Sequence, residues 1–139
     1  GNVETTTMDY IIRDHSSKKF QARKKAMEDA VTVINSRYGQ GTAELDMADQ
    51  YYNMLEKVKP QMHIVDTALA AMRDLGIEPK VIPVRGGTDG SQLSYRGLPT
   101  PNLFTGGHNA HGKHEFISVL SMEKAVDLIL KIVELYGGK

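Results

Sequence analysis

Short segments with β-strand periodicity alternate with helical segments along this chain, and this alternation is the feature that most constrains its fold. Apolar side chains recur at nearly every second position in Thr5–Arg13 and again in Thr42–Met47, as they do in half-buried strands. Between these runs, apolar residues follow helical spacing over Phe20–Ile34, after Ser16 or Ser17 as a plausible N-cap. Strand, helix and strand predict one compact β-α-β unit.

The second half of the chain alternates in the same way. An apolar stripe over Val65–Leu75 predicts a helix that stops at Gly76, and the β-branched residues of Lys80–Val84 predict a short strand. The remaining predicted elements are a short helix through Leu93 to Arg96 capped by Thr88 or Asp89, an extended segment from Leu98 to Thr105, and a last helix from its N-cap Ser121 to Tyr136. Pro60 interrupts any helix in its neighbourhood, so the domain boundary is placed there. Helices alternating with strands indicate an α/β architecture.

The composition is that of a folded globular protein without a strong electrostatic field. Hydrophobic residues make up 40% of the 139 residues, and 17 basic side chains balance 17 acidic ones. With no net charge to attract a phosphate backbone or an anionic surface, we expect neither nucleic acid nor a membrane as a partner. The chain has no cysteine, which excludes disulfides and thiolate metal sites. We expect a soluble, cytoplasmic protein whose metal ligands are His, Asp or Glu.

The densest cluster of possible metal ligands lies in Gly106–Glu115, which holds three of the five histidines. The spacing of His108, His111 and His114 would place them on one face of a helix, where imidazoles could bind a zinc ion. Glycines and an asparagine disfavour a helix here and indicate an irregular loop, from which one or two histidines point inward. From spacing alone, histidines of the surface or of a turn are the simpler interpretation.

A second candidate is the turn Arg85-Gly86-Gly87, between a predicted strand and a predicted helix. The backbone N–H groups of such a turn can hold an anion, and an arginine can bind a carboxylate or phosphate through two parallel hydrogen bonds. A glycine turn that serves only the chain geometry explains the pattern equally well. The residues alone leave both interpretations open.

Both candidates lie in one segment with a specific resemblance. From Pro83 the chain reads PVRGGTDGSQLSYRGLPTPNLFTGGHNAHGKHEF, which resembles the C-terminal part of the tripeptide aminopeptidases, a family of the dizinc metallopeptidase clan. The resemblance continues through MDYIIRD at positions 8–14, YYNM at 51–54 and MEKA at 122–125. It therefore covers essentially the whole chain.

The resemblance implies part of a two-domain α/β enzyme. Members of the clan have a catalytic domain with two zinc ions and a smaller inserted lid or dimerisation domain. On this basis residues 1–59 would form the second, α+β half of the lid, and residues 60–139 the last part of the α/β catalytic domain. The chain opens with Gly1 rather than methionine, and we expect it to be a fragment of a longer enzyme that self-associates through the lid region.

The resemblance also assigns site residues. The last metal ligand of the family is a histidine four residues before a glutamate, which makes His111 the zinc ligand here and Glu115 a candidate partner in the surrounding shell. The other two histidines of the cluster receive no metal role. Arg85 matches a turn that faces the substrate, and Arg13 matches an arginine expected to reach the C-terminal carboxylate of a small peptide.

The implied activity is the release of N-terminal residues from tripeptides by water that two zinc ions activate, with a glutamate as general base. The other metal ligands and that glutamate belong to motifs that this chain lacks, so we expect no catalytic residue in it and no activity from the chain alone. Two alternatives remain: a related dizinc amidohydrolase or dipeptidase, and a stand-alone anion-binding or dimerisation α/β module.

Overall fold

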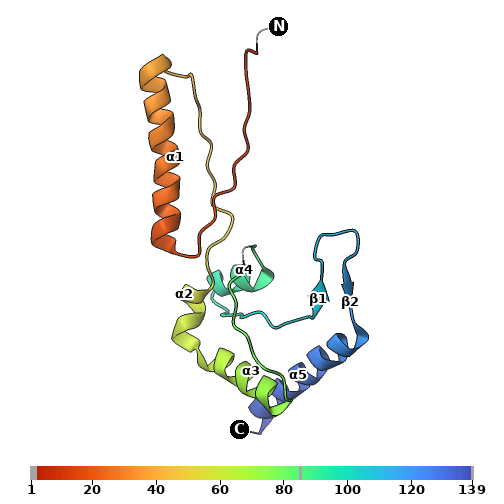
Figure 1. Ribbon diagram of the computed structural model, residues 1–139. Helices are drawn as coiled ribbons and strands as arrows, with labels where there is room; N and C mark the ends of the chain where they lie inside the picture. The colour runs from red at the N-terminus through yellow and green to blue at the C-terminus, as the bar shows by residue number, and fades with distance from the viewer. Residues whose placement is uncertain (1–2, 85, 139) are drawn as a thin grey trace. The chain divides into compact units, whose positions relative to one another are not determined.

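The computed structural model describes residues 3–84 and 86–138 (Figure 1). The chain divides into two compact units, which we call the first unit (Gly1–Asn53 with Pro83–Gly87) and the second unit (Met54–Ile82 with Thr88–Lys139). The elements in chain order are the helices α1 (Ser17–Tyr38) and α2 (Leu55–Val58), the 3-10 helix η1 (Lys59–Gln61), the helices α3 (His63–Asp74) and α4 (Asp89–Tyr95), the strands β1 (Gly107–His108) and β2 (Phe116–Ile117), and the helix α5 (Val119–Gly137).

Helix α1 is the main element of the first unit. Ser16 is its N-cap: the hydroxyl oxygen accepts a hydrogen bond from the Lys19 N–H at 3.4 Å, which satisfies one of the unpaired donors of the first turn. The helix ends at Gly39, whose φ of 110° is easily reached only by glycine. None of the 22 residues of α1 is buried, so the predicted apolar stripe is at most half-buried.

Polar contacts connect α1 to the segment that follows it and runs back beside it (Figure 1). The Lys24 ammonium lies 2.8 Å from the Asp49 carboxylate, which also accepts a hydrogen bond from the Tyr52 hydroxyl at 2.7 Å. These two donors lower the pKa of the Asp49 carboxyl. Further along, the Asn35 side chain both donates to the Ala43 carbonyl and accepts from the Ala43 N–H, at 2.9 Å each.

Among residues 3–84 and 86–138, the buried apolar side chains lie in the second unit. They are Val58 of α2, Ala68 and Ala71 of α3, and Leu128 of α5. Helices α3 and α5 pack against each other (Figure 1), and small residues on α3 allow a close approach. Helix α3 is followed by Gly76 with a φ of 69°, as the sequence predicts.

Helix α4 is tied tightly to the extended segment after it. Thr88 is the N-cap, and its hydroxyl accepts from the Ser91 N–H while the Ser91 hydroxyl accepts from the Thr88 N–H, both at 3.2 Å, the capping box that stabilises a helix start. The Ser94 hydroxyl donates to the Gly90 carbonyl at 2.6 Å and accepts from the Thr100 N–H at 2.9 Å. With its residue only 2% exposed, this hydroxyl fixes the start of the following segment.

The strands differ from prediction. Within the described residues the sheet consists of β1 and β2 alone, an antiparallel pair, and no strand forms at 5–13, 42–47 or 80–84. The predicted β-α-β pairing is therefore wrong for this part of the chain. Alternation marks a segment that suits a half-buried surface, but a strand also needs a neighbour to complete its hydrogen bonds. Helices combined with a small sheet still place the chain in the predicted α/β class.

The last helix begins earlier than predicted. Its N-cap is Ser118, whose hydroxyl oxygen accepts from the Ser121 N–H at 3.1 Å. Ser121 is thus the donor to the cap rather than the cap, because two serines three residues apart fit the same capping pattern from either end. No described helix has the combined length and apolar character that crossing a membrane requires.

Candidate functional site

The histidine cluster forms the tip of the hairpin of β1 and β2. In the register of the two strands, Gly107 pairs with Ile117 and His108 pairs with Phe116. The His108 and Phe116 rings stack with centroids 5.0 Å apart and an interplanar angle of 18°, so the His108 ring packs within the hairpin. The residues between the strands, 109–115, are called the histidine loop below. The loop is irregular, as its glycines predict.

Hydrogen bonds within the histidine loop close it on itself. The Asn109 side-chain amide donates to the His114 carbonyl at 3.2 Å, and the Gly112 N–H donates to the Asn109 carbonyl at 2.9 Å. A Cβ at Gly112 would lie 2.9 Å from that same carbonyl oxygen, so a larger residue would force the turn open. The Glu115 N–H in turn donates to the Gly112 carbonyl at 3.2 Å.

His111 stands at the exposed end of this loop in the left-handed conformation, with a φ of 65°. Its backbone N–H donates to the Glu115 carboxylate at 3.2 Å. Glu115 and His111 are therefore in contact, but through the main chain of the histidine and not through its imidazole. No described residue forms a hydrogen bond with that imidazole.

The donor set of the histidine loop fits one position of a metal site and not a whole site. An exposed neutral imidazole without a protein hydrogen-bond partner is suited to ligate zinc. Among the described residues, however, no three His, Cys, Asp or Glu side chains come together as a possible metal group. His111 can thus supply one ligand, and a complete site requires donors from outside the described residues.

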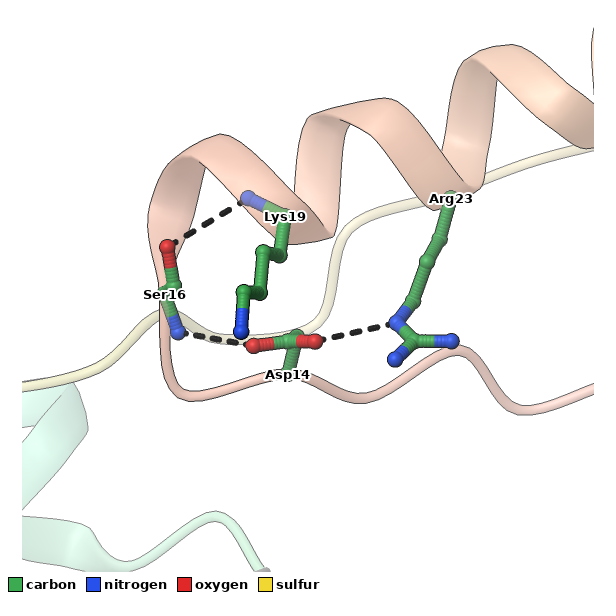
Figure 2. Close-up of polar contacts among 4 residues, drawn as sticks. All are labelled: Asp14, Ser16, Lys19 and Arg23. Atoms are coloured by element: carbon green, nitrogen blue, oxygen red, sulfur yellow. Dashed lines mark hydrogen bonds and ion pairs between the residues drawn. The ribbon is translucent and has the colours of Figure 1, made fainter.

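The two arginines assigned to the substrate have different standing. Arg85 lies outside the described residues. Arg13 is exposed in the first unit, directly before a polar junction that Figure 2 shows. There the Asp14 carboxylate accepts from the Ser16 N–H and from Arg23 Nε, both at 3.0 Å. These hydrogen bonds, with the positive charge of Arg23, lower the pKa of the Asp14 carboxyl, and they fix the chain next to Arg13.

The glycine turn shows close packing at one of its two glycines. A Cβ at Gly87 would lie 2.6 Å from Cδ1 of the Tyr51 ring, so this glycine leaves room for an aromatic side chain. The first turn of the following helix α4 is closed by the capping box of Thr88 and Ser91. At Gly87 these contacts support the geometric interpretation of the turn.

Sequence reasoning missed two residues that shape these sites. Asn109 has a φ of 55°, and its position among glycines is a signal for a left-handed turn residue. Asp14 precedes the cap Ser16 by two residues, a spacing at which an aspartate carboxylate often accepts a hydrogen bond from the backbone N–H of the second following residue. Both signals are visible in the sequence once turn chemistry is considered at single residues.

Comparison with known proteins identifies the family. Residues 3–135 match the profile of Peptidase family M20/M25/M40. The chain is 64% identical over 137 residues to a protein named Peptidase T from Clostridium novyi (strain NT), covering 99% of this chain and 34% of that protein. It is 61% identical over 139 residues to the Peptidase T of Caldanaerobacter subterraneus subsp. tengcongensis, covering all of this chain and again 34% of the relative.

A third relative, the Peptidase T of Halothermothrix orenii, is 58% identical over 139 residues, with the same coverage of 100% and 34%. The chain thus spans about a third of the length of the curated relatives that it matches. The family match extends over nearly all of the chain, from the first unit into helix α5. The chain belongs to Peptidase family M20/M25/M40.

Proposed function

We propose that this chain is the C-terminal part of a zinc-dependent tripeptide aminopeptidase that releases N-terminal residues from tripeptides in the cytoplasm. The observation that carries the proposal is the 58–64% identity, over at least 99% of the chain, to the three proteins named Peptidase T. Peptidases of the matched family are generally metal-dependent. The exposed His111 imidazole on a closed loop is in keeping with a contribution of one ligand.

In this proposal each site residue has one task. His111 holds a metal ion through its imidazole, and Glu115, in the same loop, supports His111. Arg13 and Arg85 hold the carboxylate end of the peptide, because a guanidinium pairs with both oxygens of a carboxylate at once. When bound, a pair of zinc ions would polarise the scissile carbonyl and lower the pKa of the attacking water.

The proposal leaves the remaining ligands and the general base to the part of the longer protein that this chain does not include. The described residues bring no three metal ligands together, so the chain alone is expected to be inactive. We also assign residues 1–59 to the second half of the lid and residues 60–139 to the last part of the catalytic domain.

The same proposal includes self-association through the first unit. Large apolar side chains are exposed there, among them Met8 at 67%, Ile11 at 76% and Val33 at 63%. A second copy is the proposed partner for this surface. Light scattering over a dilution series tests it: mass that rises with concentration supports the proposal, and a constant monomer mass contradicts it.

The test of the metal role compares two histidine variants in the longer enzyme. His111→Ala is expected to remove one of the two bound zinc ions. Loss of a residue that only supports a metal ligand lowers activity about 10–100-fold, and His111→Ala should lower it by more than that. His114→Ala, from the same loop, is the control and should keep both. Zinc content is measured by mass spectrometry alongside tripeptide hydrolysis. Full zinc content in His111→Ala would remove the ligand assignment.

The substrate class is tested with a panel of peptides. The wild-type longer enzyme should hydrolyse tripeptides faster than dipeptides or N-acyl amino acids, with a free N-terminus required. A preference for dipeptides or N-acyl amino acids would favour the related dipeptidase or amidohydrolase instead.

A further inference from the structure

We propose that Glu115 is a positioning residue that sets the main chain at His111, and that it acts through the backbone N–H and not as a second metal ligand. The carboxylate accepts the His111 N–H at 3.2 Å, and His111 stands in the left-handed conformation. The inference rests on the proposed function only in that it takes the His111 imidazole as a metal ligand.

The conformation of His111 needs support. At a φ of 65°, the Cβ of an L-residue approaches the following carbonyl oxygen, so this conformation is disfavoured for every residue except glycine and, less strongly, asparagine and aspartate. Asn109 has the same sign of φ, at 55°, but its short amide is suited to such a turn. Histidine adopts this conformation more often than most residues but still rarely, so a contact from outside its own side chain helps to hold it.

Glu115 provides that contact from a fixed position. Its own N–H donates to the Gly112 carbonyl at 3.2 Å, and it directly precedes β2, where Phe116 pairs with His108. The carboxylate is thus anchored on the strand and reaches back over the loop to the His111 N–H. A hydrogen bond from an amide to an ionised carboxylate is stronger than one between neutral groups.

Support through the main chain matters because the ring has no partner of its own. Metal-bound histidines are usually oriented by a hydrogen bond to the second ring nitrogen. Within the described part of the chain, the His111 imidazole has no such bond. The direction of the imidazole then depends on the backbone from which it projects, and Glu115 controls that backbone.

Two variants separate positioning from ligation. Glu115→Gln keeps a carbonyl oxygen that can accept the His111 N–H but removes the negative charge with which a glutamate would bind zinc, whereas Glu115→Ala removes both. Lys113→Ala is the matched control in the same loop. All three are measured in the 139-residue chain by NMR amide exchange, with the backbone spectrum confirming that α5 and the hairpin are retained.

The expected result is that Glu115→Ala speeds the exchange of the His111 amide by about tenfold or more. Glu115→Gln should speed it by less, because the amide oxygen still accepts the hydrogen bond without the charge, and Lys113→Ala should change it little. An amide that already exchanges freely in the wild type, or that is unaffected in Glu115→Ala, overturns the inference. Because no metal enters this measurement, it stands or fails independently of the proposed function.

A second measurement uses the longer zinc-loaded enzyme and competition with a chelator. Glu115→Ala should weaken zinc binding by about 10–100-fold, and Glu115→Gln by much less. If Glu115→Gln releases zinc as readily as Glu115→Ala, the carboxylate acts as a ligand or by its charge, and the positioning role is refuted. If His111→Ala keeps all of its zinc while the amide exchange behaves as expected, the proposed function fails and the support of the loop by Glu115 stands.

Discussion

The two units of this chain differ in the kind of contacts that stabilise each of them internally. In the second unit Ala71 and Leu128 are fully buried, on helices that pack against each other. In the first unit no residue of α1 is buried, and its contacts to the following segment are polar, such as those of Lys24 with Asp49. Burial of apolar surface stabilises a fold strongly, whereas exposed ion pairs and hydrogen bonds contribute little in water.

This difference bears on the proposed site. The histidine loop belongs to the second unit, and Arg13 belongs to the first. The proposed metal ligand therefore stands on the unit with a packed core, which suits a group that must hold its geometry. Arg13, a proposed substrate contact, lies in the unit with less apolar burial, which suits a segment that adjusts to a ligand.

The largest effect is expected from Leu128→Ala in the second unit. Truncating a fully buried leucine should lower the free energy of unfolding by about 2–5 kcal/mol, because it leaves a cavity between packed elements. The control is Val126→Ala on the same helix, which is 55% exposed and should change stability by no more than about 0.5 kcal/mol. Urea unfolding followed by circular dichroism measures both, and equal effects would show that this core is not the main support.

Ser94→Ala is expected to have the next largest effect. It removes the acceptor of the Thr100 N–H and the donor to the Gly90 carbonyl at a buried position, at a cost of about 1–3 kcal/mol. The matched serine in the first unit is the exposed Ser36, whose change to alanine should be nearly neutral. The same urea titration is the measurement. A neutral Ser94→Ala would mean that the segment after α4 does not depend on this hydroxyl.

An effect confined to the first unit is expected from Asn35→Ala. The variant loses both hydrogen bonds to Ala43, each worth about 0.5–1.5 kcal/mol, and the exchange of the Ala43 amide should speed up while the unfolding of the second unit stays unchanged. Asn35→Asp keeps the acceptor and is the control. If the Ala43 amide exchanges as slowly in Asn35→Ala as in the wild type, other contacts hold this turn.

Elements whose signals are local could be predicted from the sequence. Gly76 lies at a helix end as predicted, and the N-caps Ser16 and Thr88 are each one of the two residues predicted for that position, because a cap depends on residues within one turn. The strand predicted at 5–13 does not form, because a strand needs a pairing partner that local alternation does not reveal. The N-cap of α5 was misplaced because Ser118 and Ser121 both suit the pattern.

The candidate site shows the same division. The importance of His111 and Glu115 was predicted from a family resemblance, and their spacing in an irregular loop was visible in the sequence. The contact of the Glu115 carboxylate with the His111 N–H could not be predicted, because it depends on the left-handed backbone that the closed loop imposes. A side chain four residues away reaches an N–H only in a particular turn.

The smallest effect is expected at the junction of Asp14, whose side chain is partly buried and whose contacts are polar. Because its pKa is lowered below the ordinary 3.8, the ionised carboxylate stabilises the start of α1 above the unfolded-state pKa, and this stabilisation is lost as the pH falls through the folded-state pKa. NMR titration of the carboxyl carbon should give a midpoint below 3.8 in the wild type, and the Ser16 amide should shift with the same midpoint. In Asp14→Asn the shift of the Ser16 amide should disappear, while Leu128 and its neighbours are unaffected. A midpoint at or above the ordinary value would mean that Arg23 and the Ser16 N–H do not hold Asp14 in solution, so that the start of α1 would depend on other contacts, such as the Ser16 cap.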